Sequence, residues 1–121
     1  GYCMGGRTSL IVAGRVPDRV AAAMSFHGGG LASDDADSPH LLAPVITAAV
    51  DVGAAENDAS YTPEQSRLLN ATLTGAGVAH TIEWYSAAHG FAVPDNGPYD
   101  EAAAERHWQA MADFFATTLV P

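Results

Sequence analysis

The sequence predicts an α/β fold in which about three parallel strands are flanked by helices. Two observations carry this prediction. Apolar runs of strand length alternate along the chain with longer segments of helical periodicity. The first of these runs is also continuously small and apolar, as expected for a strand that is buried on both faces of a parallel sheet. Strands that alternate with helices imply right-handed crossovers between parallel neighbours.

Each element follows from a local pattern. The residue ranges predicted as strands are Val20–Phe26, Val45–Ala55 and His80–Tyr85. Those predicted as helices are Gly5–Ala13, a segment from Pro63 to about Gly75 or Gly77, and Asp100 to about Leu119, whereas Leu31–Pro39 and His89–Tyr99 are predicted as loops. The three strands are expected to form a small sheet within a single domain that covers residues 1–121.

Helix boundaries are marked by capping signals. Thr62 is the expected N-cap of the second helix, Pro63 stands at its first position, and Gln65 is placed to complete a capping box. Gly14 is a plausible C-cap of the first helix, with Pro17 three residues beyond it.

Composition excludes several classes of protein. Of the 121 residues, 48% are hydrophobic and 16% charged, which is typical of a globular chain. The net charge is −9 without a single lysine, and the five arginines are scattered, so we expect no nucleic-acid partner. No apolar run is long enough to cross a membrane. The single cysteine fits a reducing compartment, and we expect a cytoplasmic location.

The first five residues, Gly1 to Gly5, form a G-x-C-x-G pattern ahead of a predicted helix. This is the cysteine version of the G-x-S-x-G nucleophile elbow, in which a strained turn presents the nucleophile and the flanking glycines leave room. We therefore expect Cys3 to be a nucleophile with a thiol pKa lowered by the helix N-terminus, and the N–H of Met4 to stabilise an oxyanion. The alternative is a buried structural cysteine between chance glycines.

The remaining members of a triad should follow in the order acid, then base. Asp58 comes just after the second predicted strand, and we expect it to be the acid. Asp51 lies within that strand and Glu56 near its end, so both are weaker candidates. The alternative role of Asp58 is that of a turn former.

His89 follows the third predicted strand and is the expected base. The carboxyl ends of parallel strands gather catalytic groups, so this position suits the role. His27 ends the first strand and could line the site, but it precedes the acid. His40 and His80 are expected at the surface or at a strand start, and His107 in the core or in a salt bridge.

Five segments together resemble the dienelactone hydrolase family over nearly the whole chain. They are Gly1–Gly6 at the elbow, Ser25–Gly29 at the next strand end, Ala55–Asp58 with Pro63–Gln65 at the acid, Tyr85–Phe91 at the histidine, and Tyr99–Ala103 with Trp108 in the closing helix. The resemblance implies the C-terminal portion of an α/β-hydrolase fold. The family's fold has about twice this length, so we expect the chain to be a fragment that is weakly active or inactive in isolation.

The resemblance also implies a chemistry. Cys3 would attack the carbonyl of a small ester or lactone, His89 would transfer protons, and Asp58 would orient His89. Tyr2, His27 and Phe91 are expected to line the substrate pocket, and no cofactor or metal is implied. Val93 stands where the dienelactone enzyme has a substrate-binding arginine, which favours other substrates of the family.

Two other hypotheses about the function remain open at this point. The same triad could serve a peptidase or an acyl transferase, because it does not choose the acyl acceptor. The chain could also be a truncated, non-catalytic remnant that retains the motif. The sequence does not predict the oligomeric state.

Overall fold

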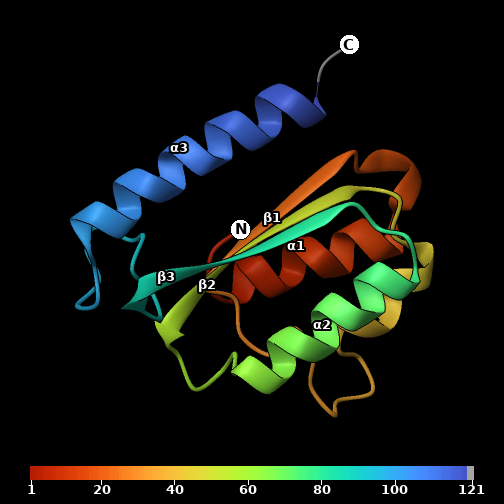
Figure 1. The fold of residues 1–121 in the computed structure, drawn as a ribbon, viewed down its shortest axis with the longest axis horizontal. Coiled ribbons are helices and arrows are strands. Elements are labelled where there is room, and N and C mark those ends of the chain that lie inside the picture. The colour runs from red at the N-terminus through yellow and green to blue at the C-terminus, as the bar shows by residue number, and fades with distance from the viewer. Residues whose placement is uncertain (120–121) are drawn as a thin grey trace.

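The computed structural model describes residues 1–119 and confirms the predicted fold class (Figure 1). The elements, in chain order, are α1 (Met4–Arg15), the 3₁₀ helix η1 (Pro17–Arg19), β1 (Ala22–Phe26), the 3₁₀ helix η2 (Pro39–Val45), β2 (Ala49–Asn57), α2 (Pro63–Gly75), β3 (His80–Ala88) and α3 (Glu101–Thr118). No helix within residues 1–119 combines the length and apolar character that a bilayer crossing demands.

The three strands form one parallel sheet in the order β1-β2-β3. Ala22 pairs with Ala49 in the first ladder, and Val50 pairs with His80 in the second. Because all three strands run the same way, their carboxyl ends lie at one edge of the sheet, and residues 27, 58 and 89 follow there.

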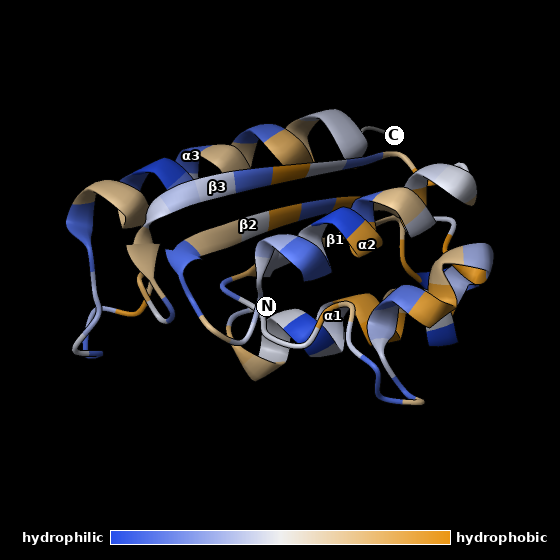
Figure 2. Ribbon diagram, turned by 60° about the horizontal axis from the view of Figure 1, so that its bottom comes forward, coloured by the Kyte–Doolittle hydropathy of each residue, from blue (hydrophilic) through white to orange (hydrophobic). Residues whose placement is uncertain are grey.

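Helices cover both faces of this sheet. In Figure 2, α1 and α2 lie on one side and α3 lies alone on the other. The period of two in β2 separates the faces: Val50 and Val52 pack in the core under α1 and α2, whereas Ala55 packs in the cluster under α3. Each face thus has its own apolar core.

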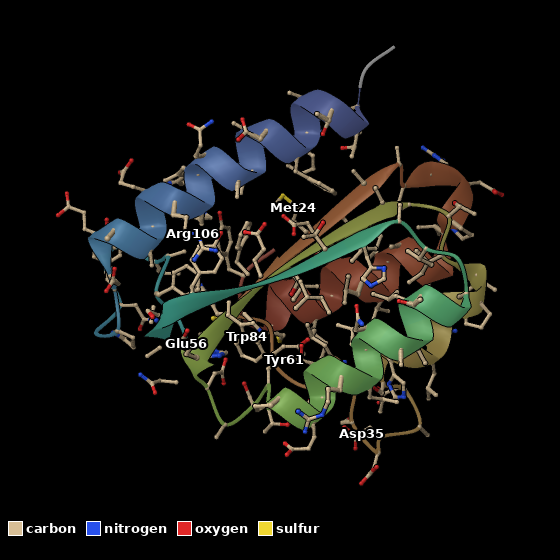
Figure 3. All side chains as sticks on the ribbon, in the orientation of Figure 1. Met24, Asp35, Glu56, Tyr61, Trp84 and Arg106 are labelled. Atoms are coloured by element: carbon tan, nitrogen blue, oxygen red, sulfur yellow. The ribbon has the colours of Figure 1, made fainter. Side chains whose placement is uncertain are left out.

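Figure 3 shows the same division among side chains, with Arg106 on the α3 side and Trp84 on the α2 side of the sheet. The Arg106 guanidinium donates to the Trp84 carbonyl at 2.9 Å and lies 3.9 Å from the centre of the Tyr85 ring. This cation–π contact fixes α3 over β3.

The helix N-termini are capped by side chains. Thr62 accepts a hydrogen bond from the N–H of Gln65 at 3.2 Å, with Pro63 at the first position of α2 as the sequence predicts. Asp100 accepts from the N–H of Ala103 at 2.8 Å and so caps α3. Each cap satisfies an amide that the helix itself leaves unbonded.

Two sequence predictions need correction. The second strand begins at Ala49 rather than Val45, because residues 39–45 form η2, and Pro44 within it cannot donate to a strand ladder. His40, expected at the surface or at a strand start, is buried in η2, where its Nδ1 lies 2.6 Å from the hydroxyl of Ser38. A polar partner makes this burial tolerable.

Candidate active site

Cys3 occupies a tight turn between an extended segment and α1. Tyr2 pairs in parallel with Phe26, and the N–H of Cys3 donates to the carbonyl of Phe26 at 3.1 Å. The next residue, Met4, starts the helix. The backbone of Cys3 has φ 52° and ψ −123°. Residues with a side chain rarely adopt such a positive φ. Such strain concentrates at functional positions and is the geometry expected of a nucleophile elbow.

The glycines of this turn differ in their importance. A Cβ on Gly1 would collide with the carbonyl of Gly5, which agrees with the predicted crowding. A Cβ on Gly5 would meet nothing within 4 Å, so the expectation that both flanking glycines relieve crowding is wrong for the second one. Gly6 is the tight position instead, because its Cβ would lie 2.5 Å from Oγ of Ser25 in β1.

Asp58 and His89 are hydrogen-bonded across the carboxyl ends of β2 and β3. Oδ2 of Asp58 lies 2.7 Å from Nδ1 of His89. The carboxylate can only accept, so Nδ1 carries the proton and Nε2 is left as the unprotonated nitrogen of the neutral ring. The Asp58 side chain is 3% exposed, whereas that of His89 is 41% exposed. The ring therefore has a buried, fixed side and a side open to solvent.

Ser60 completes the surroundings of the Asp58 carboxylate. Oδ1 accepts from the N–H of Ser60 at 2.9 Å and from its hydroxyl at 2.5 Å, and this hydroxyl lies 3.5 Å from Nδ1 of His89. The sequence analysis did not single out Ser60. Its place two residues after an aspartate, where Asx turns bond, is the signal that could have found it.

His27 lies beside the Cys3 thiol, although it precedes the predicted acid in the sequence and was not the expected base. Its Nδ1 is 3.2 Å from Sγ of Cys3, and the ring meets those of His89 and Phe91 edge-on at centroid distances of 5.5 and 4.9 Å. The side chain is fully buried, and Nε2 has no hydrogen-bond partner among the described residues. Burial, helped by the nearby His89, lowers the pKa of His27 to about 4, so the ring is neutral at pH 7.

The three side chains converge at the edge of the sheet. Sγ of Cys3 and one ring nitrogen each of His27 and His89 all lie within 4.8 Å of one another. These atoms come from residues far apart in sequence and meet because β1 and β3 end at the same edge of the sheet. A thiol and two imidazoles can transfer protons among themselves, and they are also soft ligands for a cation.

The acidity of the Cys3 thiol differs from the sequence expectation. Burial raises the pKa of this thiol, and the negative charge of Asp58 raises it further. The predicted lowering by the helix N-terminus is therefore wrong for this arrangement, and the resting thiol is protonated at neutral pH. Activation would need a base to remove the proton as the thiol reacts.

The other sequence-predicted residues surround this centre in different ways. Met4 is the first residue of α1, so the helix offers its N–H no hydrogen-bond acceptor. Its side chain is largely exposed. Phe91 is fully buried against Tyr85, with ring centroids 4.9 Å apart. The hydroxyl of Tyr2 lies 2.7 Å from Nε2 of His107. His107 is buried in the core, which was one of its two predicted positions, the other being a salt bridge.

A groove of the described chain lies away from this cluster. A hollow of about 580 Å³ between α2 and β3 is lined by Glu56, Arg67 and Trp84, among others. It does not include Cys3, and no hydrogen bond joins a hydroxyl to a histidine among the described residues that line it. The cluster at the strand ends is therefore the better candidate for chemistry.

The family of the protein follows from comparison with known sequences. The sequence profile of the dienelactone hydrolase family matches residues 1–119. The chain belongs to this family. No curated protein sequence matches it.

Solved structures agree with this assignment. A protein from Klebsiella pneumoniae assigned as a dienelactone hydrolase is 28% identical, with a TM-score of 0.86 over 96% of this chain and 50% of its own. A dienelactone hydrolase-like promiscuous phosphotriesterase from metagenomic libraries is also 28% identical, with a TM-score of 0.83 over 98% and 50%. This dienelactone hydrolase-family chain thus spans about half the length of both relatives.

A more distant structure supports the fold alone. The enol-lactonase of Burkholderia xenovorans is 15% identical, with a TM-score of 0.72 over 96% of this chain and 64% of its own. Membership of the family supports a hydrolase in general terms, and the reaction of this chain has to be argued from its own site.

Proposed function

We propose that the protein hydrolyses small carboxylic esters or lactones through an acyl-enzyme on Cys3. The observation that carries the proposal is the 2.7 Å bond between Asp58 and His89 beside a strained Cys3 elbow. A nucleophile, a base and a group that orients the base are the three parts that nucleophilic acyl transfer requires.

His89 is the better base of the two histidines near the thiol. The Asp58 carboxylate would stabilise the imidazolium that forms when Nε2 of His89 takes the thiol proton. Among residues 1–119, no carboxylate is hydrogen-bonded to His27, and with a pKa of about 4 it is too weak a base at neutral pH. We assign His27 to the wall of the site, where it holds the resting thiol.

The proposed reaction has two halves. His89 takes the proton of Cys3 as Sγ attacks the ester carbonyl, and the amide of Met4 at the start of α1 stabilises the oxyanion. The intermediate collapses to a thioester, and His89 returns the proton to the leaving alcohol. A water molecule, deprotonated by His89, then attacks the thioester, and the proton passes back to Sγ as the acid leaves.

Substitutions at Cys3 and His89 test the proposal. We expect residues 1–121 alone to hydrolyse p-nitrophenyl acetate or a simple aryl lactone only weakly, and Cys3→Ala and His89→Gln to abolish the activity that is measured. His80→Gln is the matched control, because His80 starts β3 and its ring is hydrogen-bonded to Asn70 and the carbonyl of Val78, away from Cys3. Intact mass after a brief reaction should show one acetyl group, absent from Cys3→Ala. Turnover that survives Cys3→Ala would refute the assignment.

The same experiment separates the alternatives. Release of the acyl group only to an added amine or alcohol would indicate an acyl transferase, and cleavage of peptides a peptidase. A protein that forms no acyl-enzyme would be the non-catalytic remnant. Because the proposed thiol nucleophile must stay reduced, we propose a reducing compartment such as the cytoplasm as its location.

A further inference from the structure

The proposed reaction gives one buried group near the thiol no proton to transfer. His27 is fully buried and its Nδ1 faces Sγ of Cys3 at 3.2 Å. Packing alone could be served by an apolar ring at this position. A buried imidazole directed at a thiol is instead what a site for a soft cation needs, because both groups are preferred zinc ligands.

We propose that Cys3, His27 and His89 bind a zinc-type divalent cation, and that the bound cation masks the Cys3 thiol. A tetrahedral zinc ion places its sulfur and nitrogen ligands about 3.3–3.6 Å apart. The Cys3–His27 separation of 3.2 Å is close to this value, and all three ligand atoms lie within 4.8 Å of one another. Cation binding would draw the His89 ring closer to Sγ while its Nδ1 keeps the bond to Asp58.

Asp58 supplies the outer partner of His89, one of the two histidine ligands. Metal-bound histidines donate their second ring nitrogen to a carboxylate or a carbonyl, which orients the ring and strengthens the ligand. Nδ1 of His89 already donates to Asp58 at 2.7 Å, so Nε2 is the nitrogen left for the cation. The carboxylate also adds a buried negative charge beside the cation.

The fourth position of the cation would face solvent. The side chain of His89 is 41% exposed and Cys3 is half-buried, so a water molecule can complete a tetrahedron. On binding, the cation displaces the thiol proton, which passes to solvent, and a sulfur–metal bond forms. Cation binding rests on the geometry alone, and only a resulting loss of hydrolysis rests on the proposed function.

Cobalt and alkylation report on the site without any substrate. We expect protein stripped with EDTA to bind one Co²⁺ with a sulfur-to-cobalt charge-transfer band that is absent from Cys3→Ser. Zn²⁺ should displace the cobalt and slow alkylation of Cys3 by iodoacetamide at least tenfold, and EDTA should restore the rate. A protein that binds zinc but hydrolyses no ester would refute only the proposed function.

Histidine variants decide the ligand set. His27→Gln and His89→Gln should each weaken Zn²⁺ binding at least tenfold by calorimetry, whereas His80→Gln should leave it unchanged. If His27→Gln fails to fold, the His89→Gln variant retains the test, because the His89 side chain is 41% exposed whereas that of His27 is fully buried. Alkylation that Zn²⁺ does not slow, or equal zinc affinity in wild type and His89→Gln, would overturn the proposal.

Discussion

The hydroxyl of Tyr2 donates a hydrogen bond to Nε2 of His107 at 2.7 Å and so joins the elbow to α3. The direction of this bond follows from the other ring nitrogen. Nδ1 of His107 lies 2.6 Å from the carbonyl of Ala104, which can only accept, so Nδ1 carries the proton and Nε2 accepts. Burial lowers the pKa of His107, which favours this neutral form. The residue beside the nucleophile is thus fixed by a helix almost at the other end of the chain.

Removal of the Tyr2 hydroxyl should destabilise the protein. Tyr2→Phe leaves Nε2 of the fully buried His107 without a partner, and an unsatisfied buried acceptor costs about 1–3 kcal/mol. Urea unfolding should show this loss, with Tyr99→Phe as the control, since Tyr99 lies at the exposed end of the loop before α3. Equal stability of Tyr2→Phe and wild type would mean that water replaces the hydroxyl.

Much of the candidate site was predictable because the strands are parallel. An apolar run that ends before Asp58 and a predicted strand that ends before His89 bring both residues to the same edge, and the 2.7 Å bond between them follows from the register of β2 and β3. The core role of His107 was likewise one of two predicted alternatives. Local sequence patterns are enough to predict residues whose position follows from regular strands and helices.

The contact between His27 and Cys3 could not be predicted in the same way. His27 has φ 39°, a left-handed conformation that turns its ring away from the continuation of β1 and toward the thiol. Propensity assigns such a backbone to glycine, three of which follow directly. The burial of His40 depends similarly on a single hydroxyl, that of Ser38, which no periodic pattern specifies.

Gly53 in β2 should tolerate no side chain. A Cβ there would lie 2.6 Å from Cδ1 of Phe26 and 3.0 Å from Cε1 of Tyr85, two fully buried rings that have little room to move. Gly53→Ala should therefore lower the free energy of unfolding by about 1–3 kcal/mol through overpacking. Gly75→Ala at the end of α2 is the matched control, because its Cβ would meet nothing within 4 Å. Similar denaturation midpoints for the two variants would contradict the packing argument.

Asp51 should make stability depend on pH. It is buried in β2 facing α3, and burial together with the charge of Glu83 raises its pKa from 3.8 to about 6. The groove it faces also presents Arg106 and Asp113 from α3. Between pH 4 and 6 the folded state holds more protons than the unfolded state, so the free energy of unfolding falls as pH rises through this window.

Asp51→Asn should therefore stabilise the protein at pH 7 and change little at pH 4. One pKa unit corresponds to about 1.4 kcal/mol, and with partial screening by solvent we expect a gain of about 1–2 kcal/mol at pH 7. Thermal unfolding at both pH values measures it. Glu83→Gln should give a smaller gain of the same sign, because it removes only the second cause and also breaks the exposed ion pair with Arg106. A variant that is less stable than wild type at pH 7 would show that a favourable partner of the Asp51 carboxylate outweighs the cost of its burial.

The Asp58 carboxylate should matter to the reaction far more than to the fold. Asp58→Asn keeps the shape but replaces the acceptor of the His89 Nδ1 proton by an amide, which can hold the wrong tautomer and cannot stabilise an imidazolium. If the proposed reaction is correct, kcat should fall roughly 10³–10⁴-fold with a modest change in KM. Asp95→Asn, in the exposed turn after β3, is the control and should retain full activity. Equal kcat in both variants would show that Asp58 does not support His89 in the reaction and that another group is the base.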